Sequence, residues 1–185
     1  MSFFPIYLKL NRVLIIGGGE VAFRKLTKVL EFSTNIRVIS KEFIEDFKGI
    51  AKEYNIELIQ RGYRRGDLEG FNIVIVATDI ELQREIFLES RDKRVLVNSV
   101  DSLEYCDFTF SSFIKRGDLV ISISTGGIAP TFGRLLKGYI QNLLPNSIES
   151  FLDKMGDLRR ELSKGERRME IFRRESRDYF SKNFK

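Results

Sequence analysis

The feature that most constrains this chain is the run Gly17-Gly18-Gly19, placed directly after a short apolar run over 12–16. With Ala22 the glycines fit the pattern G-x-G-x-x-A, and helical apolar spacing follows. In this pattern the first glycine permits a tight turn, the second admits close approach of a ligand, and the small residue lets helix and strand pack closely. The turn therefore predicts a dinucleotide pyrophosphate at a helix N-terminus, with a turn that serves packing alone as the alternative.

Apolar runs and helical spacings alternate over the first hundred residues. The expected strands cover 12–16, 36–39, 56–59, 73–77 and 95–97, and the expected helices cover 21–32, 42–54 and 80–91. Strands that alternate with helices favour right-handed crossovers and a parallel sheet. The predicted fold class is therefore α/β, with a Rossmann-like parallel sheet in a first domain over 1–107 that would bind the dinucleotide.

The pattern changes after residue 101. Alternating apolar residues on either side of 115–118 predict a hairpin; they are Phe108, Phe110, Leu119, Ile121 and Ile123. Pro130 then opens a strongly apolar helix that ends before Pro145. This segment, 108–145, offers more hydrophobic surface than a small sheet should cover, so it predicts a homodimer. Residues 146–185 keep only helical spacing, broken near residue 164, and form an expected α-helical C-terminal domain.

Composition limits the chemistry. The chain has no histidine and a single cysteine, Cys106, so a general base must be a carboxylate, tyrosine, lysine or that thiol. No metal site is expected. Thirty-one Lys and Arg against 26 Asp and Glu give a net charge of +5, which favours anionic partners. No apolar run approaches the roughly 20 residues of a membrane span, and no signal layout begins the chain, so we expect a reduced, cytoplasmic protein without a membrane partner.

Polar residues follow the expected strands at the edge where a ligand of such a sheet binds. Ser40 stands where an acid that grips the adenosine ribose is usual, and Glu42 comes slightly late. Lys41 would tolerate a 2′-phosphate, so the residues alone leave NAD or NADP open. Glu42 has the alternative role of capping the following helix. Thr78 is a candidate cofactor contact, and Asp79 is equally suited to cap the next helix.

Two further segments carry candidate chemistry. The fifth strand ends in Asn98-Ser99-Val100-Asp101 on the same edge, so Asn98 is a candidate cofactor contact and Asp101 a candidate general base. The alternative is that Asp101 has a structural role, as a carboxylate at the strand end that bonds to backbone groups. The loop that contains Ser124, Thr125, Gly126 and Gly127 joins a strand to a helix, and its N–H groups suit substrate carboxylates. A purely structural loop is equally consistent with these residues.

The tail, 146–185, contains eleven Lys or Arg and eight Asp or Glu. Because the acidic residues interleave the basic ones, a solvated helical face is the favoured interpretation over a nucleic-acid surface. Two other classes of function stay open at this point. One is a nucleotide-sensing regulatory module, which would use the glycine turn without a base at Asp101. The other is a nucleic-acid binder that acts through the tail.

The motifs together resemble the precorrin-2 dehydrogenase family, the first module of sirohaem synthases. The resemblance covers about residues 1–145 in the family's order and spacing. The matching segments are Pro5-Ile6-Tyr7-Leu8, 13–22 with Arg24-Lys25, Ala77-Thr78-Asp79, Asn98-Ser99-Val100-Asp101, 123–130 and Arg134-Leu135-Leu136.

The resemblance implies a specific activity. It implies oxidation of precorrin-2, a polycarboxylate tetrapyrrole, to sirohydrochlorin with NAD⁺, and it leaves open whether Fe²⁺ is then inserted as a substrate. The family's cofactor contacts fall on Gly19, Glu20, Val21, Lys41 and Glu42. Its catalytic aspartate matches Asp101, and its dimer forms through the segment that is 108–144 here.

Overall fold

The computed structural model describes residues 8–184. The chain divides into two compact units, with the division between residues 109 and 110. The expected first boundary, 107/108, lies two residues earlier, and residues 110–145 of the expected dimerisation segment fall in the second unit together with the tail. Pro5, Ile6 and Tyr7 of the resemblance, and Lys185 of the tail, lie outside the described residues.

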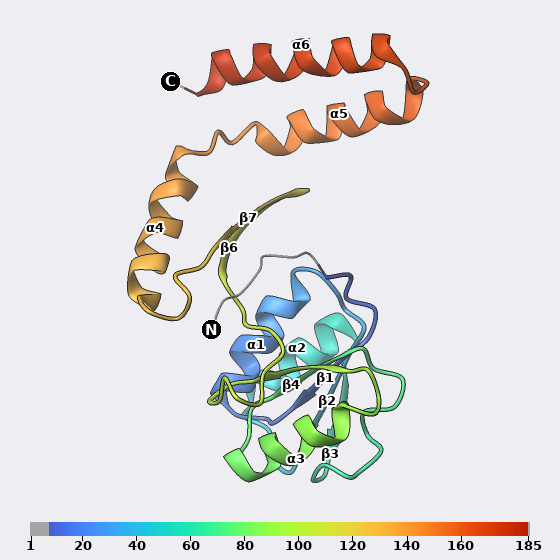
Figure 1. Cartoon of the computed structure of the whole chain (residues 1–185), viewed down its shortest axis with the longest axis vertical. Helices are drawn as coiled ribbons and strands as arrows, with labels where there is room; N and C mark the ends of the chain where they lie inside the picture. The colour runs from blue at the N-terminus through green and yellow to red at the C-terminus, as the bar shows by residue number, and fades with distance from the viewer. Residues whose placement is uncertain (1–7, 185) are drawn as a thin grey trace. The chain divides into compact units, whose positions relative to one another are not determined.

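The first unit is a five-stranded sheet in the order β3-β2-β1-β4-β5, with every neighbouring pair parallel. Its elements are β1 (Val13–Ile16), α1 (Glu20–Leu30), β2 (Ile36–Ser40), α2 (Asp46–Tyr54), β3 (Glu57–Gln60), β4 (Ile73–Val76), α3 (Ile80–Ser90) and β5 (Leu96–Ser99). Figure 1 shows α1 and α2 on one face of this sheet and α3 on the other. The predicted α/β fold with a Rossmann-like parallel sheet is confirmed.

Burial explains why the central strands are uninterrupted apolar runs. All residues of β1 and β4 are at most 2% exposed, because helices cover both faces of the sheet. Helix α1 packs through Ala22, Leu26 and Val29, a stripe with helical spacing. The core therefore lies directly beneath the edge at which the strands end.

The register aligns the strand ends. Ile16 pairs with Ile39 and with Val76, and Val76 pairs with Ser99. The ladder continues one residue further, because the N–H of Gly17 donates to Ile39 at 2.9 Å and the N–H of Ala77 to Ile16 at 2.8 Å. The segments that follow β2, β1, β4 and β5 therefore begin side by side. Strand order reverses between β1 and β4, which is where ligands bind in sheets of this kind.

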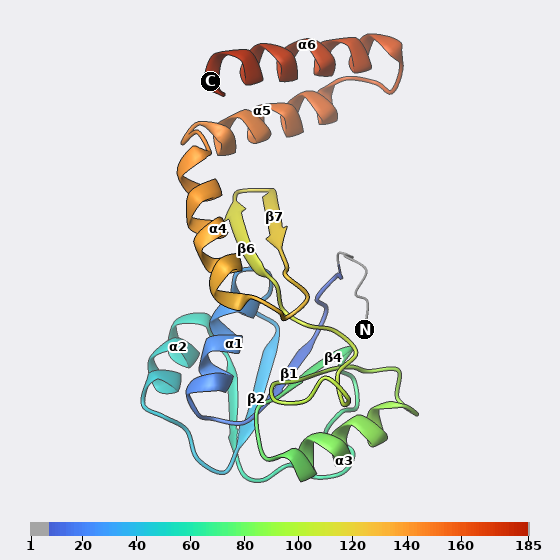
Figure 2. The same ribbon diagram turned by 60° about the vertical axis from the view of Figure 1, so that its left-hand side comes forward.

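The second unit consists of a hairpin and three helices. Its elements are β6 (Ser112–Arg116), β7 (Leu119–Ile123), α4 (Pro130–Leu143), α5 (Ile148–Glu161) and α6 (Glu166–Asn183). Figure 2 shows α4 beside the hairpin and α5 beside α6. None of the helices within residues 8–184 combines the length and the apolar character that a bilayer span requires.

Two expected elements begin several residues later than the sequence indicated. The first hairpin strand begins at Ser112, so Phe108 and Phe110 precede it. The turn is only Gly117-Asp118, and Gly117 has φ +54°, as the first position of a type II′ turn requires. Helix α2 begins at Asp46 rather than residue 42, because the intervening loop closes on the glycine turn, with the N–H of Ile44 donating to Gly18 at 2.9 Å.

Candidate functional site at the carboxyl edge of the sheet

The three glycines of the first turn meet different surroundings. Gly17 has φ +123°, and a Cβ there would lie 2.3 Å from the carbonyl oxygen of Ala77. A Cβ on Gly18 would lie 2.0 Å from the carbonyl oxygen of Glu42. A Cβ on Gly19 would meet no atom within 4 Å among the described residues. Gly17 and Gly18 are therefore required for close packing of the turn, whereas the position of a Cβ on Gly19 is open space.

That open space lies at the start of α1. Gly19 is the N-cap and has no side chain that could accept hydrogen bonds from the first-turn N–H groups. These N–H groups and the positive helix end fit the pyrophosphate of a dinucleotide. Glu20 and Val21 follow and are both exposed. The carboxylate of Glu20 already interacts favourably with the helix dipole, so it competes with a phosphate for the same end.

The end of β2 brings its three candidates to the turn. The Oγ of Ser40 would be 2.8 Å from a Cβ on Gly18, so Ser40 lies against the glycines. Lys41 and Glu42 are exposed. The N-cap of α2 is Glu45, so the interpretation of Glu42 as a helix cap is wrong. Both charged side chains are therefore available to a ribose or its phosphate.

The end of β4 divides its two polar residues between structure and site. The carboxylate of Asp79 accepts the N–H of Leu82 at 2.9 Å, so its predicted role as N-cap of α3 is confirmed. Thr78 is half-buried, and its backbone carbonyl accepts a hydrogen bond from the Gln83 side chain at 2.7 Å. Thr78 thus stands at the reversal of strand order, next to the glycine turn.

The end of β5 contains one exposed carboxylate and two buried polar side chains. Asn98, 2% exposed, donates from Nδ2 to the carbonyl of Phe108 at 2.8 Å and to Sγ of Cys106 at 3.4 Å. Ser99 donates to the carbonyl of Tyr105 at 2.7 Å. These bonds hold the loop after β5, so the cofactor contact expected of Asn98 stays a prediction based on its place alone.

Asp101 is exposed, and its Oδ2 accepts a hydrogen bond from Nε2 of Gln83 at 3.4 Å. No backbone group within residues 8–184 donates to this carboxylate, which leaves the structural alternative for Asp101 without its expected partners. The edge therefore brings together an open glycine turn and, after the strand two places along the sheet, an exposed carboxylate. This arrangement suits a cofactor that takes hydride and a base that takes a proton.

The expected substrate loop belongs to the second unit. Gly126 and Gly127 have φ +62° and +83°, and neither would place a Cβ near any described atom. The N–H of Gly126 donates to Oγ of Ser124 at 3.2 Å, and the N–H of Ala129 donates to Oγ1 of Thr125 at 3.1 Å. The N–H groups of Gly126 and Ala129 are thus already bonded within the loop and are not available to a substrate carboxylate. For these two groups the interpretation as a purely structural loop is favoured.

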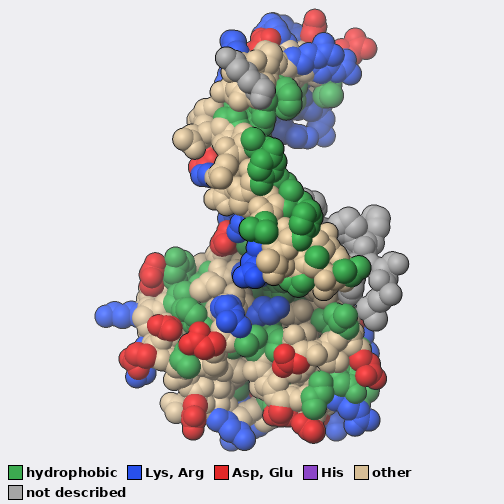
Figure 3. Space-filling view, turned by 90° about the vertical axis from the view of Figure 1, so that its left-hand side faces the viewer, with side chains coloured by type: hydrophobic (Ala, Val, Ile, Leu, Met, Phe, Trp, Pro, Cys, Tyr) green, Lys and Arg blue, Asp and Glu red, His purple; other side chains and the backbone are tan. Residues whose placement is uncertain are grey.

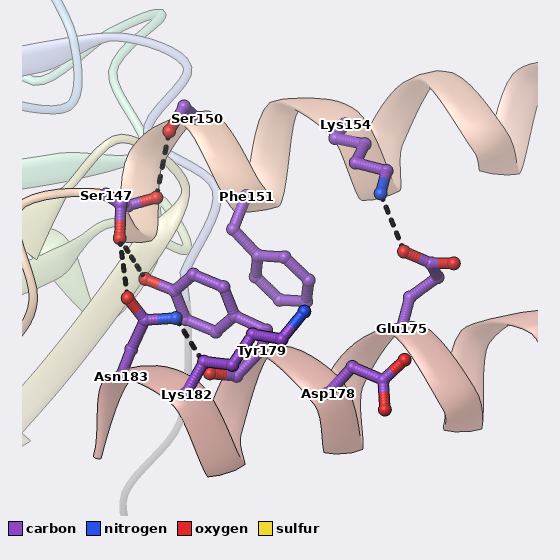
Figure 4. A pocket seen from close by; sticks show the side chains of 9 residues that line it. All are labelled: Ser147, Ser150, Phe151, Lys154, Glu175, Asp178, Tyr179, Lys182 and Asn183. Carbon is purple, nitrogen blue, oxygen red and sulfur yellow. Dashed lines mark hydrogen bonds and ion pairs between the residues drawn. The ribbon is translucent and has the colours of Figure 1, made fainter. Parts of the chain in front are cut away.

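A groove of about 340 Å³ lies between α5 and α6, also in the second unit. Figure 4 shows Tyr179 stacked on Phe151, at 4.0 Å between ring centroids, and Lys154 paired with Glu175 at 2.6 Å. Lys154 and Lys182 are matched there by Glu175 and Asp178. Because its charges balance, this groove does not suit a polyanion, and the ion pairs support a solvated helical face for the tail.

Sequence reasoning gave no role in the site to Gln83 or to Lys25, although Lys25 stood in a segment that matches the family. Gln83 is wholly buried in the first turn of α3, and its place on the stripe with Ile86 and Ser90 was the signal that could have found it. Lys25 lies on α1 close to Cys106; burial, with repulsion from Lys28, lowers the pKa of its ammonium to about 8. The described residues contain no group of three or more aspartate, glutamate or cysteine side chains that could hold a metal ion.

Comparison with known proteins agrees with this geometry. A family model described as "Putative NAD(P)-binding" matches residues 5–112, more than half of the chain. Siroheme synthase of Pseudomonas fluorescens (strain SBW25) is 33% identical over 150 residues, which are 80% of this chain and 32% of that protein. Siroheme synthase 1 of Serratia proteamaculans (strain 568) is 34% identical over 176 residues, 91% of this chain and 37% of that protein.

The chain thus spans about a third of the length of these relatives. A solved structure named "SirC, precorrin-2 dehydrogenase" superposes with a TM-score of 0.71 at 20% identity, covering 91% of this chain and 87% of that one. This likeness shows that the fold is shared. The resemblance drawn from the sequence motifs is confirmed by these relatives.

Proposed function

Since the chain belongs to this NAD(P)-binding family, we propose that it is an NAD⁺-dependent dehydrogenase that oxidises precorrin-2 to sirohydrochlorin. One observation carries the proposal: an open glycine turn and an exposed Asp101 share the carboxyl edge of one sheet in a chain without histidine. The similarity to siroheme synthases and to a precorrin-2 dehydrogenase supports the choice of substrate.

The residues at the edge have separate roles in the proposal. The backbone N–H groups of Gly19, Glu20 and Val21, at the start of α1, hold the pyrophosphate. The segment 40–42 holds the adenosine ribose, and Thr78 contacts the cofactor nearer its reactive end. NAD⁺, when bound, supplies the hydride acceptor. Orientation and proton removal belong to the protein.

Asp101 is the proposed general base. It takes the proton that precorrin-2 loses when hydride passes to NAD⁺, and no histidine competes for that role. The substrate is a polycarboxylate, and the chain carries a net charge of +5, so capture should be fast and should weaken as salt rises. We extend the proposal to Fe²⁺ as a second substrate, with Asp101 receiving the pyrrole N–H protons that iron displaces one after the other and releasing each to solvent.

The proposal includes a homodimer. Helix α4 and the loop before it expose a stripe of large apolar residues at helical spacing: Ile128 at 90%, Phe132 at 59%, Leu135 at 70%, Tyr139 at 64% and Leu143 at 57%. Figure 3 shows hydrophobic side chains following this helix. An exposed apolar stripe of this length can pack against the same stripe of a second copy about a two-fold axis, which supports dimerisation through α4. A cytoplasmic location, in keeping with the free thiol of Cys106, completes the proposal.

An anaerobic assay with precorrin-2, NAD⁺ and then Fe²⁺, followed by absorbance, tests the activity. The proposal predicts formation of NADH and sirohydrochlorin first, and a further spectral change to sirohaem after Fe²⁺ is added. A nucleotide-sensing module would bind NAD⁺ without reducing it. Salt-sensitive retardation of labelled RNA or DNA, with no NADH formed, would instead identify a nucleic-acid binder.

A further inference from the structure

Gln83 is a polar residue in a place where an apolar one would be expected. It lies in the first turn of α3 and is 0% exposed. Its Nε2 donates to the backbone carbonyl of Thr78 at 2.7 Å and to Oδ2 of Asp101 at 3.4 Å. Both partners are acceptors, so they fix the orientation of the amide group. The two amide hydrogens therefore serve two residues of the proposed site.

The carbonyl oxygen of the same amide group supports a role for these two hydrogen bonds. The Oε1 of Gln83 is buried and has no hydrogen-bond partner among residues 8–184. An unpartnered buried carbonyl destabilises the folded state, and methionine would fill a similar volume without that cost. A buried polar group left half-satisfied in this way calls for a functional explanation. The donors, and not the acceptor, are what this position uses.

The two bonds connect segments that follow neighbouring strands. Thr78 follows β4 and Asp101 follows β5, and the backbone joins the same strands where the N–H of Val100 donates to Val76 at 3.2 Å. Asp101 itself is exposed, so its carboxylate would otherwise rotate freely. We propose that Gln83 is a positioning residue that holds the Asp101 carboxylate in one orientation relative to Thr78. This inference rests on the proposed function, in which Asp101 is the base.

A double-mutant cycle tests it. Gln83→Met removes the donors and keeps the volume, so the single-turnover rate of precorrin-2 oxidation should fall as much as about 10²-fold, the cost of a misplaced catalytic group. The dissociation constant for NAD⁺ should stay unchanged. On an Asp101→Asn background the same substitution should change the rate by less than about twofold, because a residue that acts through Asp101 has nothing left to position.

Ser90→Ala is the matched control. Ser90 is also a buried polar residue of α3, but its Oγ donates to the carbonyl of Phe87 and accepts from the Arg91 side chain, so it contacts neither Thr78 nor Asp101. It should lower the melting temperature and leave the rate at its parental value. An equal fall in rate for Gln83→Met in both backgrounds would overturn the positioning role and make Gln83 a structural residue.

A second measurement does not depend on activity or on Gln83→Met folding. The side-chain amide of Gln83, observed by ¹⁵N NMR, should shift on Asp101→Asn, an exposed substitution, and should not shift on Asp92→Asn, which is exposed just beyond α3. An unmoved Gln83 amide would overturn the contact itself. If the Gln83 amide shifts on Asp101→Asn but the parental chain does not oxidise precorrin-2, the proposed function is overturned and the contact between Gln83 and Asp101 still stands.

Discussion

The first unit buries many of its large apolar residues, whereas the second unit leaves most of them at least partly exposed. In residues 8–109 the strands β1 and β4 are sealed between helices, and the glycine turn and Asp101 stand on this rigid base. In the described part of 110–184, Ile114 and Ile148 are the only large hydrophobic residues that are buried. The same unit exposes the whole α4 stripe, together with Met169 and Phe180.

This difference separates two kinds of function. A unit that buries its own core can hold catalytic groups at fixed distances. A unit that leaves its apolar stripe uncovered is completed by a partner, here proposed to be a second copy of the chain. We therefore expect substitutions at the sheet edge to change binding and rate, and substitutions on α4 to change assembly.

The largest expected effect comes from Asp101→Asn. The substitution keeps the shape of the side chain and removes its basicity, so single-turnover oxidation should fall by about 10²- to 10⁴-fold. Because Asp101 is exposed and contacts one side chain, the melting temperature should barely move. NAD⁺ affinity should also persist. A stable variant with the parental rate would refute the assignment of the base, and a destabilised one would favour a structural role.

Gly19→Asp should separate NAD⁺ binding from folding. The space beside Gly19 admits a side chain, and aspartate is a favourable N-cap, so stability should be kept or slightly raised. Like charges about 4 Å apart near a protein surface repel by about 4 kcal/mol. We expect NAD⁺ affinity to fall by about 10²-fold or more, measured by calorimetric titration. Parental affinity in the variant would remove the pyrophosphate from this turn.

On α4, Leu135→Ala should weaken the dimer and leave the sheet intact. Burying a leucine side chain contributes about 1.5–3 kcal/mol, and two-fold symmetry counts each loss twice, so the dimer dissociation constant should rise by at least about 10²-fold. Gln141→Ala, exposed on the opposite side of α4, is the control. Sedimentation over a dilution series distinguishes the two. A parental chain that is monomeric at micromolar concentration contradicts the proposed assembly.

Serine at two adjacent glycines should sharpen the contrast within the turn itself. Gly18→Ser places a Cβ 2.0 Å from the carbonyl oxygen of Glu42 and should destabilise the fold by about 1–3 kcal/mol. Gly19→Ser gains an N-cap and should change the free energy of unfolding by less than about 0.5 kcal/mol. Urea unfolding measures both. Equal losses at the two positions would show that Gly19 is also required for packing.

The smallest effect concerns pH. Burial lowers the pKa of Lys25 to about 8 from an ordinary value of 10.5, so the folded state binds fewer protons than the unfolded state between these values. The free energy of unfolding should therefore rise with pH across that window, as far as Lys25 contributes. Lys25→Met should flatten this rise in urea unfolding at a series of pH values. Parallel curves for the parent and the variant would show that Lys25 titrates normally.

Much of the first unit could be predicted from its sequence because each signal is local. Uninterrupted apolar runs mark strands buried on both faces, and the glycine turn, Ala22 and the Asp79 cap all act within a few residues. The late start of α2 could not be predicted, because it depends on Ile44 bonding to Gly18 across the fold.

The same reason explains the other errors. Phe108 alternates with the hairpin residues, yet its carbonyl accepts from Asn98 in the first unit. Gln83 and Asp101 lie 18 residues apart in the chain, with the strand β5 between them, so periodicity shows only that Gln83 faces inward. The balance of exposed and buried apolar residues in 110–184 is likewise a property of the assembled unit.

The central claim is that the sheet edge carries out NAD⁺-dependent oxidation of precorrin-2. A strictly anaerobic single turnover, with the protein and NAD⁺ in excess over precorrin-2, tests it most directly. We predict that NADH and sirohydrochlorin form at the same rate and in equal amounts, and that Gly19→Asp slows the formation of both when NAD⁺ is near its dissociation constant for the parental chain. Sirohydrochlorin formed without NADH, or bound precorrin-2 and NAD⁺ that do not react, would contradict the account.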